Sequence, residues 1–340
     1  MDATKNQMNS VFKKILIVCP AHAVTAGPEA LHQLAALLNQ LGQPAAMVYH
    51  PFHQRAETPE VYLSYQVPVE HYQDTPGIFI LFPEIMPVAA LKVKVATAGI
   101  WWMSVNNYTC VRYINRFRDK IRYLKNLLRG KRPWLGMSAL KSLRHFAQSH
   151  YAYTYLQKHH ITAQMLSDPI PYYTQPDYLT ALASTQNSAP RDNIILYNPK
   201  KGWPTIKKLM RAFPQLSFKP LQNLNRLQLA AAFLTAKIYV DFGHHPGKDR
   251  LPREAALHGA CVITGLHGSA QNSVDIPIVD RYKLDPNATN FSHQFFSLVS
   301  EIFNHFSQCQ NDFQHYRAII AEEPRLFQEQ IISAFNLSNL

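Results

Sequence analysis

The feature that most constrains the fold is one stretch in the second half of the sequence, IYVDFGHHPGKDRLPREAALHGACVITG, residues 238–265. Its apolar ends, 238–242 and 261–264, are rich in β-branched and aromatic residues, as is typical of buried parallel strands. Between them, Pro252 suits the first turn of a helix and Gly259 suits its end. The stretch therefore predicts a strand, a loop, a short helix and a second strand.

The loop inside this stretch has the character of an anion site. A helix that begins near Leu251 directs its free N–H groups and the positive end of its dipole toward the loop. Gly243 and Gly247 allow the backbone to turn sharply there. Three basic side chains flank the helix start: Lys248, Arg250 and Arg253. We therefore expect this loop to bind a negatively charged group.

Strand-like and helix-like segments alternate along the rest of the chain. In the first half we expect strands at 15–19, 45–49, 78–82, 100–105 and 163–166, and helices at 28–41, 87–98 and 138–149. In the second half we expect strands at 194–197, 217–220 and 276–279, helices at 204–213 and 224–236, and helical structure toward the C-terminus. Such alternation predicts an α/β protein with parallel sheets and right-handed crossovers.

A length of 340 residues suits two domains. The segment 169–193 is rich in Pro, Tyr, Ser, Thr and Asn and is typical of a linker. We expect domains at 1–168 and 194–316 and a C-terminal helix at 317–340 that packs back on the first domain. Two Rossmann-like domains that face each other across a cleft would place four loops along it, since ligands bind at the carboxyl ends of parallel strands. Those loops are 20–27, 198–202, 243–251 and 265–272.

The charge of the chain is unevenly distributed. There are 34 Lys and Arg residues against 22 acidic ones, a net charge of +12. The segment 112–144 alone holds eleven basic residues and one acid, Asp119, with apolar residues at helical spacing between them. Its basic patch is Arg112, Arg116, Arg118, Lys120, Arg122, Lys125, Arg129, Lys131 and Arg132. Three interpretations fit this pattern: an ordinary surface helix, a nucleic-acid contact, or a helix that lies on an anionic membrane surface. We favour the membrane-surface helix.

Targeting and cysteine patterns point to the cytoplasm. The four cysteines are far apart and form no CxxC pair, so neither a zinc ribbon nor a disulfide framework is indicated. The first eighteen residues lack the apolar core of a signal peptide, and no apolar run approaches the roughly 20 residues that span a bilayer. We expect a cytoplasmic protein, peripheral on the inner face of the membrane.

Three histidines are candidates for the cleft. His244 and His245 are adjacent, so their side chains are expected to point apart, and no carboxylate with ligand spacing accompanies them. We therefore expect no metal site and no metal requirement. One of the pair is expected to line the cleft, and His22 in the first loop is a candidate general base on the opposite wall.

Two motifs in the second half carry a family resemblance. PREAALHGACVITG contains Glu254 in the first turn of a helix, and YNPKKG places Lys201 and Gly202 after a strand. Both resemble the nucleotide-sugar-binding domain of GT-B glycosyltransferases, especially the family-4-like group. The resemblance implies that Glu254 accepts hydrogen bonds from ribose hydroxyls and that Lys201 binds the pyrophosphate. The chain departs from the family at Pro246, where related enzymes keep the first glutamate of a pair.

The resemblance extends to other loops. Lys200 would replace an arginine that usually precedes the Lys-Gly pair. The loop with Gly27, Pro28 and Glu29 resembles the glycine-containing loop that faces the donor phosphate and the acceptor. The expected donor-binding residues are Lys200, Lys201, Gly202, Gly243, Gly247, Lys248, Arg250, Arg253, Glu254 and Ser269.

The resemblance implies a glycosyltransferase that moves a sugar from a nucleotide-sugar donor to a hydroxyl of a glycan or lipid-linked acceptor. By family analogy alone, we expect it to act in bacterial surface polysaccharide synthesis. The first domain would bind the acceptor. Cationic side chains would stabilise the departing nucleoside diphosphate without any cofactor. The rival hypotheses are a nucleotide-sugar epimerase or a phosphorylase on the same fold, and a non-enzymatic nucleic-acid-binding protein that uses the basic segment.

Overall fold

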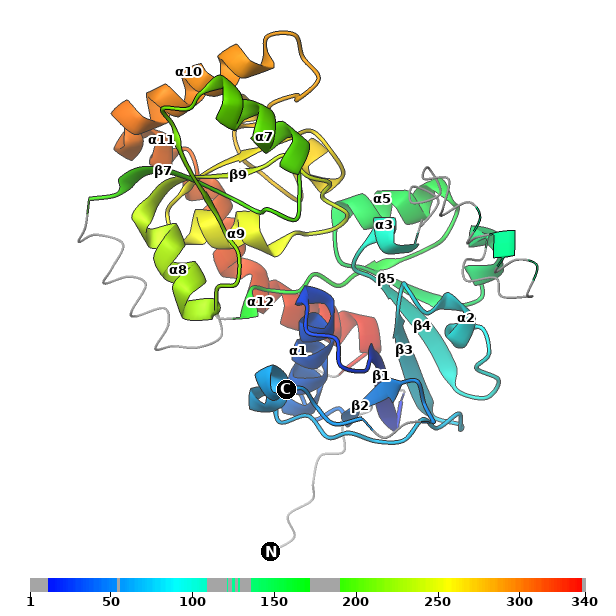
Figure 1. Ribbon diagram of the computed structural model, residues 1–340. Coiled ribbons are helices and arrows are strands. Elements are labelled where there is room, and N and C mark those ends of the chain that lie inside the picture. The colour runs from blue at the N-terminus through cyan, green and yellow to red at the C-terminus, as the bar shows by residue number, and fades with distance from the viewer. Residues whose placement is uncertain are drawn as a thin grey trace, which may run out of the picture. The chain divides into compact units, whose positions relative to one another are not determined.

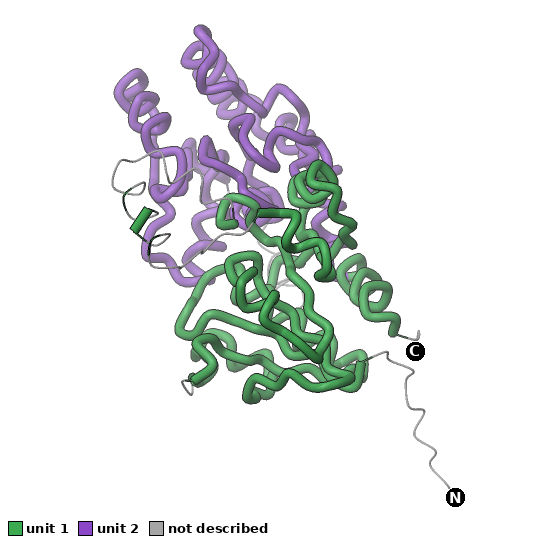
Figure 2. Tube along the Cα trace, turned by 90° about the vertical axis from the view of Figure 1, so that its right-hand side faces the viewer, with its two compact units in different colours: residues 1–171, 325–340 green, residues 172–324 purple. Residues whose placement is uncertain are grey.

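The computed structural model describes residues 12–53, 56–108, 136–171 and 190–337, together with Ile121, Leu124, Lys125 and Leu128. The chain divides into two compact units, shown in different colours in Figure 2. Unit 1 comprises residues 1–171 and 325–340, and unit 2 comprises residues 172–324. The last helix, α12 (Gln314–Phe335), contributes to both units.

Unit 1 is built on a six-stranded parallel sheet with the strand order β2-β1-β3-β4-β5-β6 (Figure 1). Its strands are β1 (Lys14–Pro20), β2 (Ala45–His50), β3 (Ile78–Pro83), β4 (Thr97–Trp102), β5 (Arg144–Ala147) and β6 (Gln164–Met165). Its helices are α1 (Ala26–Gln40), α2 (Pro87–Ala90), α3 (Val105–Tyr108) and α5 (His150–Lys158), with 3-10 turns at Glu60–Tyr65 and Met137–Leu140.

The interior strand β1 is buried on both faces, which explains the unbroken apolar run Ile15–Cys19. Ile15 and Ile17 belong to one core cluster, together with α1 and the end of α12. Leu16 and Val18 belong to another cluster on the opposite face, with α2 and α5. Adjacent strand residues point to opposite faces, so a sheet covered on both sides requires apolar residues at every position.

Unit 2 contains a four-stranded parallel sheet with the order β10-β9-β7-β8. Its strands are β7 (Asp192–Tyr197), β8 (Ser217–Pro220), β9 (Ala236–Asp241) and β10 (Cys261–Thr264). Its helices are α7 (Trp203–Ala212), α8 (Arg226–Thr235), α9 (Arg250–Leu257), α10 (Phe291–Asn304), α11 (Phe306–Asn311) and the first part of α12. The βαβ unit predicted from residues 238–265 is β9-α9-β10.

The helix predicted at 87–98 is wrong beyond its first turn. The helix α2 ends at Ala90, and β4 begins at Thr97. The Asp74 carboxylate accepts hydrogen bonds from the backbone N–H groups of Lys94, Val95 and Ala96 at 2.7–2.9 Å. Those N–H groups are therefore unavailable to a helix.

Two further predicted elements are wrong. The predicted helix at 138–149 is a 3-10 turn followed by β5, because Arg144–Ala147 pair with Gly99–Trp102 of β4. The real helix, α5, starts one residue after Ser149, whose side chain caps it by accepting from the Ala152 N–H at 3.1 Å. The predicted strand at 276–279 is irregular, although Ile276 and Ile278 remain buried. Pro277 lacks the N–H that a sheet ladder needs.

Candidate functional site

Three loops of unit 2 meet at the carboxyl edge of its sheet. They follow β7 (198–202), β9 (242–249) and β10 (265–268). The backbone N–H of Ser269 donates to the carbonyl of His245 at 2.8 Å, and the Ser269 hydroxyl donates to the carbonyl of Gly247 at 2.6 Å. The predicted loops of the second half therefore contact one another within this unit.

Glycine makes this close approach possible at two positions. Gly202 has a φ of +65°, and a Cβ there would lie 2.7 Å from the backbone carbon of Phe242. Gly268 has a φ of +64°, and a Cβ there would lie 2.0 Å from the His245 carbonyl oxygen. A side chain at either position would combine backbone strain with a collision. These glycines fix the separation of the loops that carry the charged groups.

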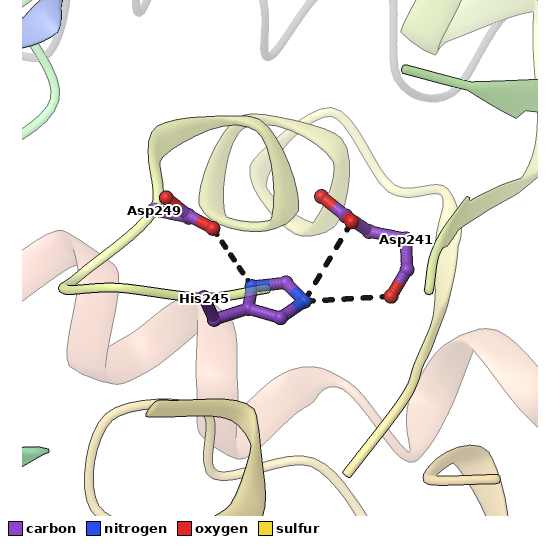
Figure 3. A group of neighbouring side chains, drawn as sticks. All are labelled: Asp241, His245 and Asp249. Atoms are coloured by element: carbon purple, nitrogen blue, oxygen red, sulfur yellow. Dashed lines mark hydrogen bonds and ion pairs between the residues drawn. The ribbon is translucent and has the colours of Figure 1, made fainter. Parts of the chain in front are cut away.

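A chain of alternating charges runs through the loop after β9 (Figure 3). The imidazole of His245 lies between two aspartates, with Nδ1 at 2.9 Å from Asp249 Oδ2 and Nε2 at 3.7 Å from Asp241 Oδ1. Lys201 Nζ lies 2.7 Å from the same Asp249 oxygen. Asp241 also accepts from the Gly243 N–H at 2.9 Å and from the Tyr239 hydroxyl at 3.1 Å. Two acids and two bases therefore alternate.

The pKa values in this chain favour its charged form. Burial lowers the pKa of His245, but the carboxylates of Asp241 and Asp249 outweigh it, so the pKa is raised above its usual value. Burial likewise opposes the charge of Lys201, whose pKa is nevertheless raised by Asp249 and Asp241. The pKa of Asp249 is lowered by His245 and Lys201 against the effect of burial. Both carboxylates therefore favour the protonated form of His245, which links Asp241 to Asp249 within the loop.

The expectation that no carboxylate accompanies the histidines at ligand spacing is wrong. Asp241 and Asp249 lie four residues on either side of His245, and one ligand atom from each of the three lies within 4.8 Å of the others. Each carboxylate faces a different ring nitrogen, however, and a metal ion can take only one nitrogen of an imidazole. Lys201 also occupies the Asp249 oxygen. The geometry fits an ion-pair chain better than a metal centre.

The short helix α9 begins beside this chain and carries its own buried charges. Glu254 is 1% exposed, and its Oε1 lies 3.0 Å from Arg250 Nε. Arg253 is equally buried: its Nη1 lies 2.8 Å from Glu323 of α12, and its Nη2 donates to the Lys248 carbonyl at 3.1 Å. Lys248 Nζ lies 2.8 Å from the other oxygen of Glu323. The loop and the start of α9 are thus fixed to α12 through Glu323.

The structure separates the predicted donor-binding residues into different environments. The exposed side chains are those of Lys200 and of the neighbouring His244. The half-buried ones are Lys201, Lys248 and Arg250, and the buried ones are Arg253 and Glu254. The buried guanidinium of Arg253 contacts Glu323 and the loop backbone, which gives it a role in holding the loop. Ser269 supports the backbone at Gly247.

The corresponding edge of unit 1 contains the first predicted loop. His22 is exposed there, with a φ of +60°. Gly27, Pro28 and Glu29 lie in the first turn of α1, where the buried Glu29 carboxylate accepts from the Tyr65 hydroxyl at 3.3 Å. The Tyr62 hydroxyl accepts from the Thr25 N–H at 3.0 Å and donates to the Thr25 carbonyl at 2.9 Å.

Most of the basic patch lies outside the described residues. The residues of the patch that lie outside the described part of the chain are Arg112, Arg116, Arg118, Lys120, Arg122, Arg129, Lys131 and Arg132. Lys125 is described, in a helical conformation and exposed, as are Ile121, Leu124 and Leu128. Among the helices that the structure describes, none has the length and apolar composition needed to cross a bilayer.

Sequence reasoning missed two acidic residues of this site. Asp241 ends a strand, and its spacing of four residues from His245 could have indicated that the two side chains interact. Glu323 lies seventy residues beyond Arg253 in a different helix, and no local pattern connects the two.

Comparison with known proteins identifies the fold. No family model matches the chain, and no curated protein matches its sequence. Solved structures match nearly its whole length. Together with the parallel sheets of its two units, these matches define the class: the chain has the α/β GT-B fold of two Rossmann-like units.

Three such structures are glycosyl-transferring enzymes. Anabaena HepE in complex with UDP and glucose has a TM-score of 0.62 at 11% identity, covering 95% of this chain and 99% of that chain. Sucrose-phosphate synthase from Thermosynechococcus elongatus has a TM-score of 0.60 at 12% identity, covering 95% and 100%. WaaG, a glycosyltransferase involved in lipopolysaccharide biosynthesis, has a TM-score of 0.56 at 11% identity, covering 94% and 99%.

Proposed function

We propose that the protein is a glycosyltransferase that uses a nucleotide-sugar donor bound at the carboxyl edge of the unit 2 sheet. The observation that carries the proposal is the meeting of Lys201, the N-terminus of α9 and Glu254 at this edge. The edge is where parallel α/β sheets bind ligands, and a helix N-terminus with a nearby cation suits a diphosphate. The shared GT-B fold adds support.

In this reaction the bond between the anomeric carbon and the diphosphate oxygen breaks, and a glycosidic bond to the acceptor hydroxyl forms. The hydroxyl proton passes to water, and the nucleoside diphosphate leaves with the bonding electron pair. Lys201 and the N–H groups of α9 would stabilise the charge that develops on the leaving group. Because the diphosphate is neutralised in this way, we expect neither a metal nor another cofactor.

Recognition of the ribose would require a local exchange of partners. The Glu254 carboxylate now faces Arg250, whose Nε lies 3.0 Å away. Two ribose hydroxyls can donate to one carboxylate. We propose that the ribose replaces Arg250 on Glu254, so that the guanidinium turns to the diphosphate. The family-4-like assignment, with Pro246 in place of the first glutamate, belongs to this proposal.

A thermal-shift screen tests the donor site. Nucleoside diphosphates and nucleotide sugars are added to the wild type, to Glu254→Gln and to the control Glu322→Gln, which alters an exposed neighbour of Glu323. We expect one nucleotide to raise the melting temperature of the wild type and the control, and to do so much less for Glu254→Gln. A wild type that responds to no nucleotide refutes the donor site, and an equal response of Glu254→Gln refutes the ribose contact.

The acceptor is proposed to be a glycan or lipid-linked molecule in bacterial surface polysaccharide synthesis, reached from the cytoplasmic face of the membrane. The basic segment 112–144 and the exposed Ile121, Leu124 and Leu128 support a peripheral contact with anionic lipids. Binding to vesicles that contain phosphatidylglycerol should weaken as salt rises. Binding that is unaffected by salt and lipid charge would remove this part of the proposal.

The rival functions make different experimental predictions. An epimerase would convert the nucleotide sugar without an acceptor, and a phosphorylase would need inorganic phosphate. A nucleic-acid-binding protein would show a steep salt dependence on DNA or RNA and no stabilisation by nucleotides.

A further inference from the structure

Unit 1 contains a cavity that none of the predicted site residues lines. It has a volume of about 560 Å³ and lies at the carboxyl end of the edge strand β2. The end of β2, Phe52 and the segments 56–58 and 69–72 form its walls. Such a volume falls within the roughly 300–1,000 Å³ of small-molecule sites. Its position at the carboxyl end of a parallel strand is the usual place for a ligand.

One wall of the cavity is an aromatic pair. The rings of Phe52 and Tyr72 are stacked, with centroids 4.4 Å apart and an interplanar angle of 23°. Both side chains remain partly exposed. The face of an aromatic ring carries negative charge and attracts the weakly positive C–H face of a pyranose. A stacked, half-exposed pair therefore provides a platform for a sugar ring.

The polar groups that line the cavity are two carboxylates, three hydroxyls and one imidazole, those of Glu57, Glu70, Tyr49, Thr58, Tyr72 and His71. Glu57 is exposed and has no ion-pair partner among the described residues, whereas Glu70 lies 2.7 Å from Lys14. A carboxylate accepts strong, charge-assisted hydrogen bonds from hydroxyl groups. An anionic ligand would be repelled by Glu57, and a purely apolar one would leave these acceptors without partners. The lining therefore favours a neutral, hydroxyl-rich ligand.

A second cavity lies beside this site and borders the first loop of unit 1. It also has a volume of about 560 Å³, and its lining shares Ala56, Glu57 and Thr58 with the first cavity. Its far side is formed by His22, in the loop between β1 and α1. Because the two cavities share segment 56–58 as a wall, they adjoin each other and together have room for more than one sugar unit.

We propose that the cavity at the carboxyl end of β2 binds a neutral pyranose residue of the acceptor, stacked on Phe52 and Tyr72 and hydrogen-bonded to Glu57. The adjoining cavity places the next part of the acceptor beside His22. This inference rests on the proposed glycosyl transfer and specifies the acceptor: a glycan with an uncharged sugar near its reacting end.

Saturation-transfer NMR on the full-length protein tests the site, with cellobiose and maltose as neutral probes and glucuronic acid as the anionic probe. The variants are Glu57→Gln and Tyr72→Leu, which removes the aromatic face but keeps the apolar bulk. The matched control is Glu60→Gln, an exposed glutamate three residues away that does not line either cavity. UDP binding is measured on the same samples by calorimetry.

We expect a neutral disaccharide to bind the wild type and Glu60→Gln equally. Glu57→Gln should bind it about tenfold more weakly, because the hydrogen bond to a charged group is lost. Tyr72→Leu should also bind it more weakly, because the aromatic face is lost. Glucuronic acid should bind less tightly than either disaccharide. Affinity for UDP should be the same in all four proteins.

The results separate the two proposals. UDP binding without any disaccharide binding, or disaccharide binding that both cavity variants leave intact, overturns the subsite while the glycosyltransferase proposal stands. Tighter binding of glucuronic acid overturns the preference for a neutral sugar. Disaccharide binding without any nucleotide binding overturns the assignment to an acceptor together with the proposed function.

Discussion

Replacing the buried side chain of His245 should destabilise unit 2 substantially. In His245→Gln, a neutral amide stands between the carboxylates of Asp241 and Asp249, which lose the cation that separates them. Removing one partner of a buried ion pair costs about 3–5 kcal/mol. We expect the lower end of that range, because Asp249 keeps Lys201 and Asp241 keeps the Gly243 N–H and the Tyr239 hydroxyl.

This free energy translates into a measurable change of melting temperature. For a cooperative unit of 150–250 residues, 1 kcal/mol shifts the melting temperature by about 2–4 °C, so a loss of about 3 kcal/mol lowers it by about 6–12 °C. Differential scanning calorimetry at pH 6 measures the transition. The matched control is His244→Gln, the same substitution at the exposed neighbouring residue, which should change the melting temperature by about 2 °C or less.

The pH dependence provides a second, independent check. The pKa of His245 is raised in the folded protein, so its contribution to stability is complete below its unfolded value of about 6.5 and is lost as the pH rises through the folded value. The difference between the wild type and His245→Gln should therefore shrink from pH 6 to pH 9. A difference that is constant with pH, or no greater than that of His244→Gln, would refute the ion-pair chain.

Three further predictions follow from other buried contacts. Gly202→Ala should weaken nucleotide binding and lower the melting temperature, because its Cβ would meet the Phe242 backbone at 2.7 Å. Gly136→Ala should change neither, because its Cβ would make only an ordinary contact with the Ser138 hydroxyl at 3.8 Å. Glu323→Gln should destabilise the protein by about 3–5 kcal/mol in urea unfolding, since Arg253 and Lys248 lose their carboxylate, and an effect as small as that of Glu322→Gln would contradict this role. Burial raises the pKa of Glu84 to about 7, so this acid destabilises the folded state once the pH rises above the pKa that the carboxyl has in the unfolded chain. Glu84→Gln should therefore raise the melting temperature at pH 8 but not at pH 4. Equal effects at both pH values would show that burial does not disfavour the ionised carboxylate.

The sheets could be predicted from the sequence because their strands are buried on both faces. Ile15–Cys19 is apolar at every position, and Ile238–Phe242 is apolar except at Asp241, a pattern that is typical of strands in a covered parallel sheet. The extent of the helix at 87–98 could not be predicted, since it is limited by Asp74, whose carboxylate reaches the backbone from another segment.

The candidate site was predictable in its location but not in the orientation of its side chains. The glycines, the helix start and the lysines near residues 200 and 248 all signalled an anion site at the sheet edge. Whether a basic side chain faces the solvent or the interior depends on a distant partner, and for Arg253 that partner is Glu323. The aromatic cavity of unit 1 has no sequence motif, because its walls come from the end of a strand and two separate loop segments.

The division of α12 between the units has a consequence for biosynthesis. Phe327, Ile331 and Phe335 fill the same core as α1 and β1, and Trp101 stacks on Phe327. Residues 325–337 are translated only after the whole of unit 2 (172–324). At about 5–20 residues per second, the first unit waits roughly ten to thirty seconds on the ribosome with this core uncovered. A chaperone that shields apolar surface during that interval should therefore increase the yield of folded protein.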